Sequence, residues 1–455
     1  MHRPRILWNT TRRSGAASSP AIPETPPRLS AAGEFDRRAL LAGIAASGLS
    51  ACATIAPPPP FDAAHVDHVL RGLVARGELV GVSALVWQRD TERYFGAFGL
   101  ADREADRPMA RDTLVQIWSM TKPVTGVALM TLWEEGRFQL DDPIAEYLPE
   151  LAALRVYAGD DASGAPILVS PDRPPTIRDL TRHTAGLTPR DGQSYVDRVY
   201  AREDPMNRAN PLAEVMRRLA RVPLHYQPGT RWAYSDAVDV QAALVERLSG
   251  RPFDAFVKER IFDPLQMHQT GFYVSPERAL RLAATYDRAE DGVFTRHRGA
   301  RTIVTDRHVK PRGGFGLVST LDDYMRFARM LLHDGDLYGS RILKRPTARL
   351  MHADQLPEGL TDKHFLPGKG QVGFGIDLAV RIAPPASDEE NFGVVGEYFW
   401  DGLASTLFWC DPENDLAAVL FVQMLPFDRM HLHRTFRRAV YEAVGVLPRT
   451  SDRVS

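Results

Sequence analysis

Apolar residues recur at two spacings along this chain, and each spacing indicates a different kind of element. Positions three or four residues apart, such as Val66, Leu70 and Leu73, indicate helices with one buried face. The segments that share this pattern are 62–76, 119–135, 212–220, 235–249, 253–260, 321–333 and 431–444.

Short continuous runs of apolar and aromatic residues predict strands near both ends of the chain. Gly81 to Trp87 and Tyr94 to Leu100 are separated by a polar turn, which is typical of a β-hairpin. The other predicted strands are 315–319, 372–382, 393–399, 405–411 and 416–424. The stretch 157–175 is rich in Asp, Pro and Gly and is expected to form a loop.

Strands at both ends with helices between them predict an α+β fold. We expect an antiparallel sheet lobe, flanked by helices, from about 61–115 and 310–450. An inserted, mainly helical lobe is expected from about 116–309, so that 61–450 forms one folded domain. A cleft between two such lobes is a common place for an active site.

The first sixty residues have the features of an export signal. Residues 1–33 are rich in Arg, Pro, Ser and Ala without apolar periodicity, which indicates a disordered or mis-started segment. The basic pair Arg37-Arg38 precedes an apolar run that ends at Leu49 and is shorter than the ~20 residues of a membrane span. This arrangement predicts a signal peptide, and the paired arginines resemble a twin-arginine signal.

The segment that follows predicts a lipid anchor. Leu49-Ser50-Ala51-Cys52 resembles a bacterial lipobox, so Cys52 is the expected lipidation site, and the prolines 57–60 form a stiff spacer. We therefore expect an exported periplasmic or outer-membrane lipoprotein that touches the membrane through its lipid only. The alternatives are cleavage at an ordinary small-residue site or retention of the apolar run as an anchor.

Composition excludes several classes of function. The chain has 455 residues, with 56 Lys and Arg against 57 Asp and Glu, so it has no bulk attraction for nucleic acid. Its two cysteines, Cys52 and Cys410, lack the spacing of a zinc or redox site, and Cys410 is expected to pack within a strand. We therefore expect neither a metal nor a cofactor.

Ser119 and Lys122 form an S-x-x-K motif at the start of a predicted helix. Serine is a favoured helix N-cap, and a residue one turn later lies on the same helix face. A serine hydroxyl becomes nucleophilic when a nearby base removes its proton, and a partly desolvated amine can do so. The motif therefore predicts Ser119 as nucleophile and Lys122 as its partner.

Two further segments carry candidate chemistry. Tyr234, in Trp232-Ala233-Tyr234-Ser235-Asp236, is a candidate general base toward Ser119 and a candidate acid toward the leaving group. Trp400-Asp401-Gly402 lies at a predicted strand edge, where a glycine allows a substrate to approach closely. Backbone N–H groups there, with that of Ser119, are candidates for an oxyanion hole.

These motifs together resemble serine β-lactamases of the class C type, and more closely the esterases related to them. The resemblance covers about 62–445 and rests on six segments in the same order. They are Ile117 to Pro123, Leu140 to Pro143, His183 to Leu187, Pro228 to Ser235, Gly313 to Thr320, and Trp400 to Gly402.

The resemblance implies a β-lactamase/transpeptidase-like fold in which Ser119 is acylated with the help of Lys122 and Tyr234. It implies an oxyanion hole made by the N–H groups of Ser119 and Leu403. The residues expected to contact the substrate are Trp118, Asp236, Trp400, Asp401 and Gly402. His183 is expected to support the site without forming a Ser-His-Asp triad.

Two positions depart from the lactamase pattern. Asp236 stands where these lactamases have Asn, and Trp400 stands where they have a Lys that helps to hold an anionic substrate. An acid and an indole do not hold a carboxylate, so we expect an esterase acting on a small carboxylic ester. The alternatives are a β-lactamase or D-alanyl-D-alanine carboxypeptidase acting on amides, a non-catalytic cell-wall-binding lipoprotein, and acyl transfer to an alcohol. The sequence leaves the natural substrate and the oligomeric state open.

Overall fold

The computed structural model describes residues 60–187, 192, 194–428 and 430–447. The expected export signal and the expected lipidation site Cys52 lie outside these residues. Within the described ranges, no helix combines the length and the apolar character that crossing a membrane requires.

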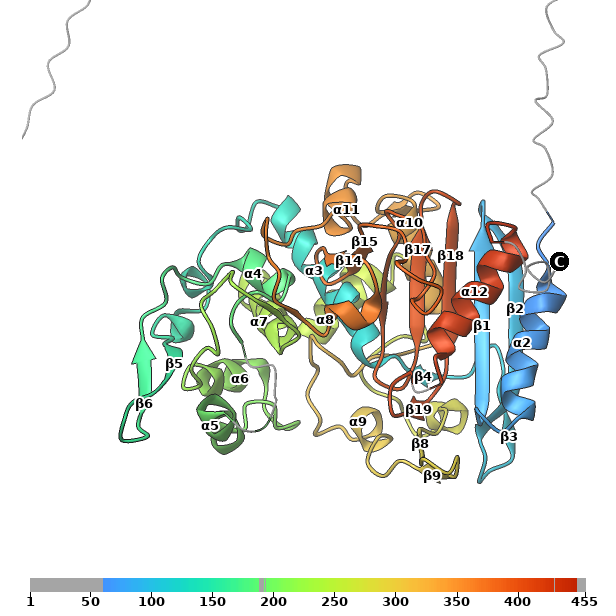
Figure 1. Cartoon of the computed structure of the whole chain (residues 1–455), viewed down its shortest axis with the longest axis horizontal. Helices are drawn as coiled ribbons and strands as arrows, with labels where there is room; N and C mark the ends of the chain where they lie inside the picture. The colour runs from blue at the N-terminus through green and yellow to red at the C-terminus, as the bar shows by residue number, and fades with distance from the viewer. Residues whose placement is uncertain (1–59, 188–191, 193, 429, 448–455) are drawn as a thin grey trace, which may run out of the picture. The chain divides into compact units, whose positions relative to one another are not determined.

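An eight-stranded antiparallel sheet joins the two ends of the described chain (Figure 1). Its strand order is β14-β15-β16-β17-β18-β1-β2-β3, so strands from the end of the chain lie beside strands from its beginning. The strands are β1 (Gly81–Gln88), β2 (Thr91–Asp102), β3 (Arg107–Pro108), β14 (Val372–Phe374), β15 (Ala379–Arg381), β16 (Tyr398–Asp401), β17 (Leu407–Asp411) and β18 (Leu416–Phe421). The predicted α+β fold with an antiparallel sheet is confirmed.

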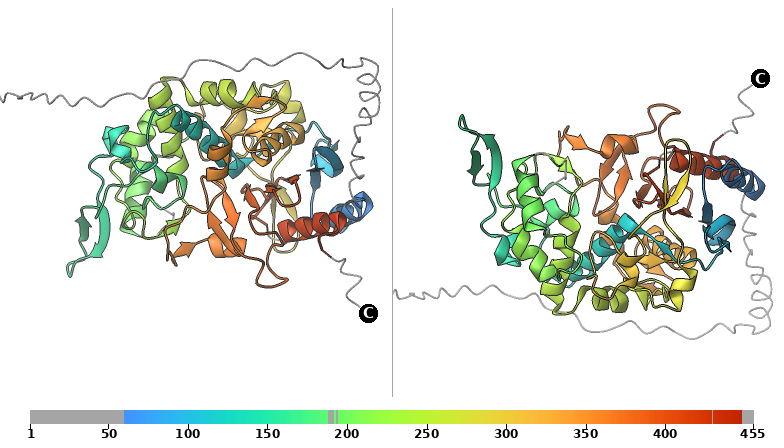
Figure 2. Two further views of the ribbon diagram at one scale, coloured as in Figure 1. Left: turned by 90° about the horizontal axis from the view of Figure 1, so that it is seen from above. Right: turned by 90° about the horizontal axis from the view of Figure 1, so that it is seen from below.

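Helices cover both faces of this sheet. Figure 2 shows α2 (Ala63–Ala75) and α12 (Leu432–Val444) on one side and α10 (Leu321–Leu332) on the other. Every residue of β17 and β18 is buried, since these central strands are covered from both sides. Cys410 is one of these buried residues, as predicted.

A group of helices forms the part of the domain beside the sheet. Helix α3 (Thr121–Glu134) is central to it, and its first twelve residues are all buried. It packs against α7 (Ala237–Ser249), which in turn contacts three shorter helices. The remaining helices of the described chain are α4 (Ile177–Thr181), α5 (Tyr195–Glu203), α6 (Leu212–Leu219), α8 (Phe253–Val257), α9 (Thr302–Thr305) and α11 (Arg345–Met351).

Several short strand pairs lie outside the main sheet. The predicted loop 157–175 contains one of them, the hairpin of β5 (Val156–Asp160) and β6 (Pro166–Val169). The others are β4 (Val115–Gln116) with β10 (Val318–Ser319), β7 (Trp232–Ala233) with β13 (Lys363–His364), β11 (Asp336–Leu337) with β12 (Ser340–Arg341), and β8 (Tyr286–Arg288) with β9 (Phe294–Arg296) and β19 (Met424–Leu425).

The predicted strand 315–319 is observed only at Val318–Ser319, and 416–424 ends at Phe421. Two other predicted strands are interrupted by left-handed backbone. The run 372–382 is a hairpin, because Asp377 adopts a left-handed conformation with φ of 55° and Gly375 donates a hydrogen bond to the Leu378 carbonyl at 2.8 Å. The predicted strand 393–399 begins only at Tyr398, because Gly396 has a φ of 89° that extended strands do not adopt.

Candidate active site

Ser119 lies in a 3-10 turn, Trp118–Met120, directly before α3. It was expected to cap the helix, but Met120 is the residue preceding α3, and no side chain caps its first turn. The backbone of Trp118 is left-handed, with φ of 50°, a conformation that costs a bulky residue roughly 1–3 kcal/mol. The hydroxyl of Ser119 is therefore free of a capping role and stands on a strained turn.

Contacts from distant segments hold this turn in place. The Ile117 N–H donates to the Leu317 carbonyl at 3.0 Å, and the Tyr324 hydroxyl donates to the Met120 carbonyl at 2.8 Å. The indole N–H of Trp118 donates to the side chain of Gln423 at 3.4 Å. These surrounding contacts offset the strain at Trp118.

The end of β16 packs directly onto the same turn. A Cβ atom at Gly402 would lie 2.2 Å from Thr406 Oγ1, 2.6 Å from the Ile117 carbonyl oxygen and 3.1 Å from Trp118 Cβ. No side chain fits there. Gly402 thus allows close approach as predicted, but to the segment that carries Ser119.

Lys122 lies one turn after Ser119 and is almost fully buried. Its ammonium donates a hydrogen bond to Ser119 Oγ at 3.3 Å and a shorter one to the Gly314 carbonyl at 2.7 Å. The same nitrogen is 4.7 Å from the centre of the Tyr234 ring, a distance at which the ring face attracts a cation. One amine therefore contacts both the hydroxyl and the phenol that the motifs indicated.

Tyr234 follows the short strand β7 and sits in an aromatic cluster. The centre of its ring is 5.0 Å from that of His183, 5.5 Å from that of Trp400 and 5.6 Å from that of Phe365. Its hydroxyl is buried and makes no hydrogen bond with any described residue. A buried hydroxyl without a hydrogen-bond partner destabilises the fold. Such a group in a native structure calls for an explanation, and a catalytic role is one.

Ser119, Lys122 and Tyr234 line one cavity of about 330 Å³. Of the other predicted residues, Trp118, Asp236 and Leu403 also line it. Leu403 lies at the rim with 51% of its surface exposed. The lining residues that the sequence did not indicate as part of the site are Arg208, Ser235, Asp239, Ile303, Gly314 and Phe315.

Trp400 and Asp401 do not line this cavity, contrary to expectation. Trp400 is 1% exposed and packs behind Tyr234 and Phe374. The carboxylate of Asp401 forms a short ion pair with Lys369, and both side chains are buried. Lys369 reaches β16 from the end of a 3-10 turn, Leu366–Lys369, about thirty residues upstream, so local sequence gave no sign of this pairing. Trp400, Asp401 and Gly402 form the layer behind the cavity wall.

Asp236 and Asp239 are the acidic residues of the cavity lining. Asp236 accepts a short hydrogen bond from the Tyr200 hydroxyl. Asp239, in the first turn of α7, is buried and accepts a hydrogen bond from the Gly313 N–H at 3.1 Å. None of the sequence motifs had indicated Asp239 as part of the site.

His183 supports the tyrosine segment and makes no hydrogen bond with Ser119. Its Nδ1 accepts the Ser235 N–H at 3.3 Å, and its ring packs edge-on against Trp232 and Phe374. Burial, together with the positive charge of Lys122, holds the pKa of His183 well below its usual range. It is therefore a neutral packing residue, in agreement with the prediction that it forms no triad.

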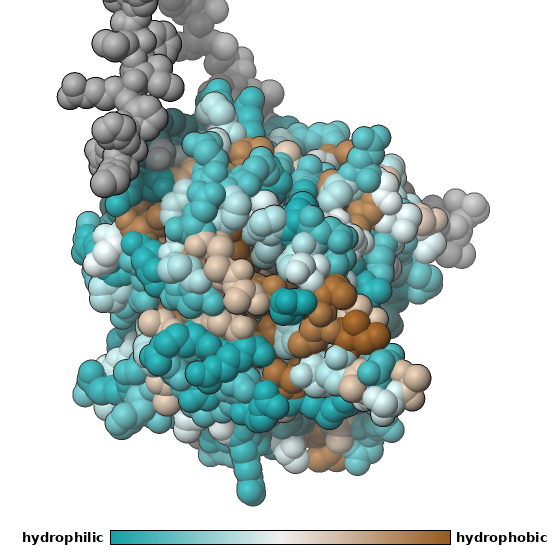
Figure 3. Space-filling view, turned by 90° about the vertical axis from the view of Figure 1, so that its left-hand side faces the viewer, coloured by the Kyte–Doolittle hydropathy of each residue, from teal (hydrophilic) through white to brown (hydrophobic). Residues whose placement is uncertain are grey.

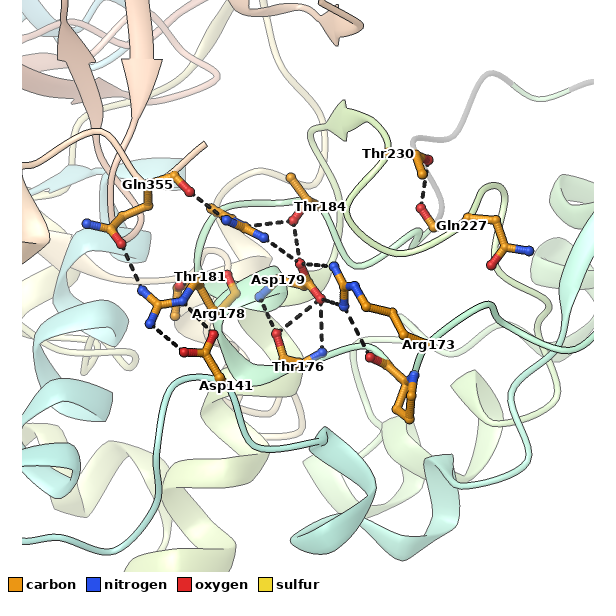
Figure 4. Close-up of polar contacts among 12 residues, drawn as sticks. Asp141, Arg173, Thr176, Arg178, Asp179, Thr181, Thr184, Gln227, Thr230 and Gln355 are labelled. Carbon is orange, nitrogen blue, oxygen red and sulfur yellow. Dashed lines mark hydrogen bonds and ion pairs between the residues drawn. The ribbon is translucent and has the colours of Figure 1, made fainter. Parts of the chain in front are cut away.

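The segment that carries His183 is held by the ion-pair network shown in Figure 4. Asp179 accepts hydrogen bonds from Arg173 at 2.5 Å, from Arg182 at 2.9 Å and from the Thr184 hydroxyl at 2.8 Å. Burial alone raises the pKa of Asp179, but these partners outweigh it and lower that pKa to about 2. The network ties α4 to the residues that pack around Tyr234.

The surface beside the helical part of the domain is mixed in character. Figure 3 shows a band of apolar side chains across an otherwise mainly hydrophilic face.

Among the described residues, no group of three or more His, Cys, Asp or Glu side chains is arranged to hold a metal ion.

Comparisons with known proteins agree with this geometry. The β-lactamase family model matches residues 66–442. Protein Rv1367c of Mycobacterium tuberculosis is 38% identical over 367 residues, covering 78% of this chain and 89% of that protein. The esterase EstB of Burkholderia gladioli is 35% identical over 377 residues, covering 79% of this chain and 89% of EstB. The solved structure of EstCE1, described as a hydrolase with promiscuous acyltransferase activity, superimposes with a TM-score of 0.70 at 26% identity, covering 83% of this chain and 98% of that one.

A lysine beside a serine hydroxyl, at the wall of a cavity on this fold, defines a serine hydrolase. With a family match that spans most of the described domain, the chain belongs to the β-lactamase family, and its relatives include esterases and acyltransferases.

Proposed function

We propose that this protein is an esterase that hydrolyses a small carboxylic ester through an acyl-enzyme on Ser119. The observation that carries the proposal is the position of Lys122 Nζ, 3.3 Å from Ser119 Oγ and 4.7 Å from the centre of the Tyr234 ring. A hydroxyl so placed can lose its proton to the Lys122–Tyr234 pair as it attacks an ester carbonyl.

The reaction proceeds in two balanced halves. With the Lys122–Tyr234 pair in the form that lacks one proton, Ser119 Oγ bonds to the carbonyl carbon as its proton passes to the pair, and the pair gives that proton to the alkoxide as the ester C–O bond breaks. Water then attacks the acyl-serine, gives a proton to the same pair, and Ser119 Oγ recovers it when the acid leaves. The N–H groups of Ser119 and Leu403, two residues of the same cavity wall, are the proposed donors to the oxyanion.

An ester is a better substrate for this site than a penicillin or a D-alanyl peptide. Lys369 Nζ lies 5.5 Å from the centre of the Trp400 ring, the residue that stands where these lactamases have a lysine. It is buried and paired with Asp401, so it is not available to a substrate carboxylate. A non-catalytic binding role would not explain why the buried amine of Lys122 lies beside the Ser119 hydroxyl.

Acyl transfer to an alcohol is the second candidate. EstCE1 is described as a hydrolase with promiscuous acyltransferase activity, and several relatives are named acyltransferases. An alcohol that enters the cavity in place of water completes the second half-reaction with the same proton transfers.

The test is covalent labelling followed by an ester panel. A fluorophosphonate should label wild-type protein at Ser119, and short para-nitrophenyl esters should be hydrolysed. Ser119→Ala should lose both, while Ser340→Ala, a serine in β12, should keep both. Hydrolysis by Ser119→Ala at the wild-type rate would overturn the proposal, and product analysis with added alcohol separates hydrolysis from transfer.

We also propose that the protein is exported and anchored by a lipid on Cys52. The lipobox-like Leu49 to Cys52 and the proline spacer before the folded domain support this proposal. In bacterial membranes fractionated after radioactive palmitate labelling, the full chain should carry label and Cys52→Ser should not. An unlabelled or cytosolic wild-type protein would contradict it.

A further inference from the structure

Arg208 places a cation in the lining of the cavity that holds Ser119. It lies in the connection between α5 and α6, and its side chain is exposed. The Lys310 N–H donates to the Arg208 carbonyl at 2.8 Å, so the backbone of Lys310, whose side chain is also exposed, lies beside that of Arg208, although Lys310 does not itself line the cavity. In the part of the chain that the structure describes, neither Arg208 nor Lys310 forms an ion pair with an acidic side chain.

The acids of the cavity have their own partners. Asp239 accepts the Gly313 N–H, and Asp236 accepts the Tyr200 hydroxyl. Burial lowers the pKa of Arg312, whereas the negative charges of Asp239 and Asp236 act in the opposite direction and favour its protonated form. Arg312 also donates to the Asn207 carbonyl at 2.6 Å, directly before Arg208. The carboxylates of Asp236 and Asp239 thus interact with the buried guanidinium of Arg312. The positive charges of Arg208 and Lys310 are not neutralised by an ion pair with any described residue.

The remaining wall of the cavity is apolar. Trp118 and Ile303 belong to one buried hydrophobic cluster, and Phe315 packs against it. Leu403 extends this apolar wall to the rim. The cavity therefore combines an apolar wall beside the nucleophile with a cationic mouth, which suits a substrate that is apolar near its ester and anionic at one end.

We propose that Arg208 and Lys310 form a subsite for a carboxylate on the substrate, so that the preferred ester carries an apolar portion at the scissile bond and a carboxylate at its far end. This inference rests on the proposed esterase function. Arg208 provides a planar fork of donors that matches a carboxylate, and Lys310 adds a second positive charge.

Two matched ester pairs test the subsite from both sides of the scissile bond. The first is the para-nitrophenyl hemiester of adipic acid against para-nitrophenyl hexanoate, which differ by a carboxylate at the end of the acyl chain. The second is para-carboxyphenyl butyrate against para-carbamoylphenyl butyrate, which differ in the leaving group. Wild type should show a kcat/KM about tenfold higher for the anionic member of at least one pair, less at high salt.

Arg208→Gln, and more completely Arg208→Gln with Lys310→Gln, should abolish this preference, so that the ratio of kcat/KM for the anionic ester to that for its neutral partner falls to about one. Arg298→Gln is the matched control, because Arg298 is also exposed but lies against a different cavity. Equal kcat/KM within both pairs, or a preference that survives the double substitution, overturns the subsite.

Binding of amides separates this inference from the proposed function. Calorimetry on Ser119→Ala protein should show tighter binding of adipic acid monoanilide than of hexananilide, and Arg208→Gln should remove the difference. That result supports the subsite even if no ester is hydrolysed, and equal binding of the two anilides overturns it even if esters are hydrolysed.

Discussion

Lys122 Nζ lies closer to the carbonyl oxygen of Gly314, at 2.7 Å, than to the hydroxyl oxygen of Ser119, at 3.3 Å. Gly314 is suited to this position because a Cβ atom there would stand 3.0 Å from Asp239 Oδ2 and 3.4 Å from Lys122 Nζ. The direction of the amine is therefore fixed by the backbone of a segment almost two hundred residues away. The side chains of Ser119 and Tyr234 contact an amine whose position the Gly314 carbonyl determines.

Tyr234→Phe should separate folding from catalysis. The hydroxyl is buried and makes no hydrogen bond with a described residue, so its removal should change the free energy of unfolding by less than about 1 kcal/mol. The loss of a proton donor and acceptor should lower kcat/KM for a neutral ester by roughly 10²–10⁴-fold. Denaturant unfolding and ester kinetics measure the two effects. Activity within a few-fold of wild type would show that the phenol takes no part in proton transfer.

Single substitutions in the Lys369–Asp401 pair should destabilise the fold strongly. Either Lys369→Met or Asp401→Leu leaves one buried charge without its partner, which costs roughly 3–5 kcal/mol. The double variant removes both charges and should recover most of the stability. Thermal unfolding of the three variants gives the coupling between the two residues.

Kinetics of the same double variant decide whether Asp401 binds the substrate. Since its carboxylate lies behind the cavity wall, KM for a neutral ester should stay within a few-fold of wild type. A large rise in KM in a stable double variant would show that the Asp401 carboxylate does contact the substrate.

Gly402→Ala should move the turn that carries Ser119. The added methyl group would meet the Ile117 carbonyl at 2.6 Å, and a backbone atom cannot swing aside as a side chain can. We expect a loss of about 1–3 kcal/mol in the free energy of unfolding together with a fall in kcat, because overpacking displaces the nucleophile. Gly271→Ala is the control, since no atom lies within 4 Å of the added Cβ there. Wild-type kcat in a folded Gly402→Ala protein would argue against close packing of β16 on the turn.

Asp179 should make the stability of the protein sensitive to acid. Its pKa is about 2 in the folded chain and about 3.9 in an unfolded one, so its ionised form stabilises the fold above pH 4. That stabilisation, on the order of 2 kcal/mol, is lost as the pH falls from about 4 toward 2. Asp179→Asn should lower Tm at neutral pH and flatten the dependence of Tm on pH across this window. Glu358→Gln, at an exposed acid, is the control.

Most of the α+β fold could be predicted because its signals are local. Helical spacing of apolar residues located α2, α3, α7, α10 and α12 to within a few residues, since a helix repeats its buried face every turn. The missed breaks near Asp377 and Gly396 are places where left-handed backbone interrupts an apolar run. The hydrophobicity of a run does not show where its backbone leaves the extended conformation.

The amino-acid order alone was enough to place Ser119 one turn from Lys122, because residues three apart in a helical turn lie close together wherever the chain folds. It also indicated the tyrosine and the family resemblance. Only the tertiary structure decided which residues line the cavity. Trp400 and Asp401, which were predicted to contact the substrate, lie behind the cavity wall. Arg208, Ile303 and Phe315 line it instead. Contacts between segments far apart in the chain depend on how strands and helices pack, and no local pattern of residues records that packing.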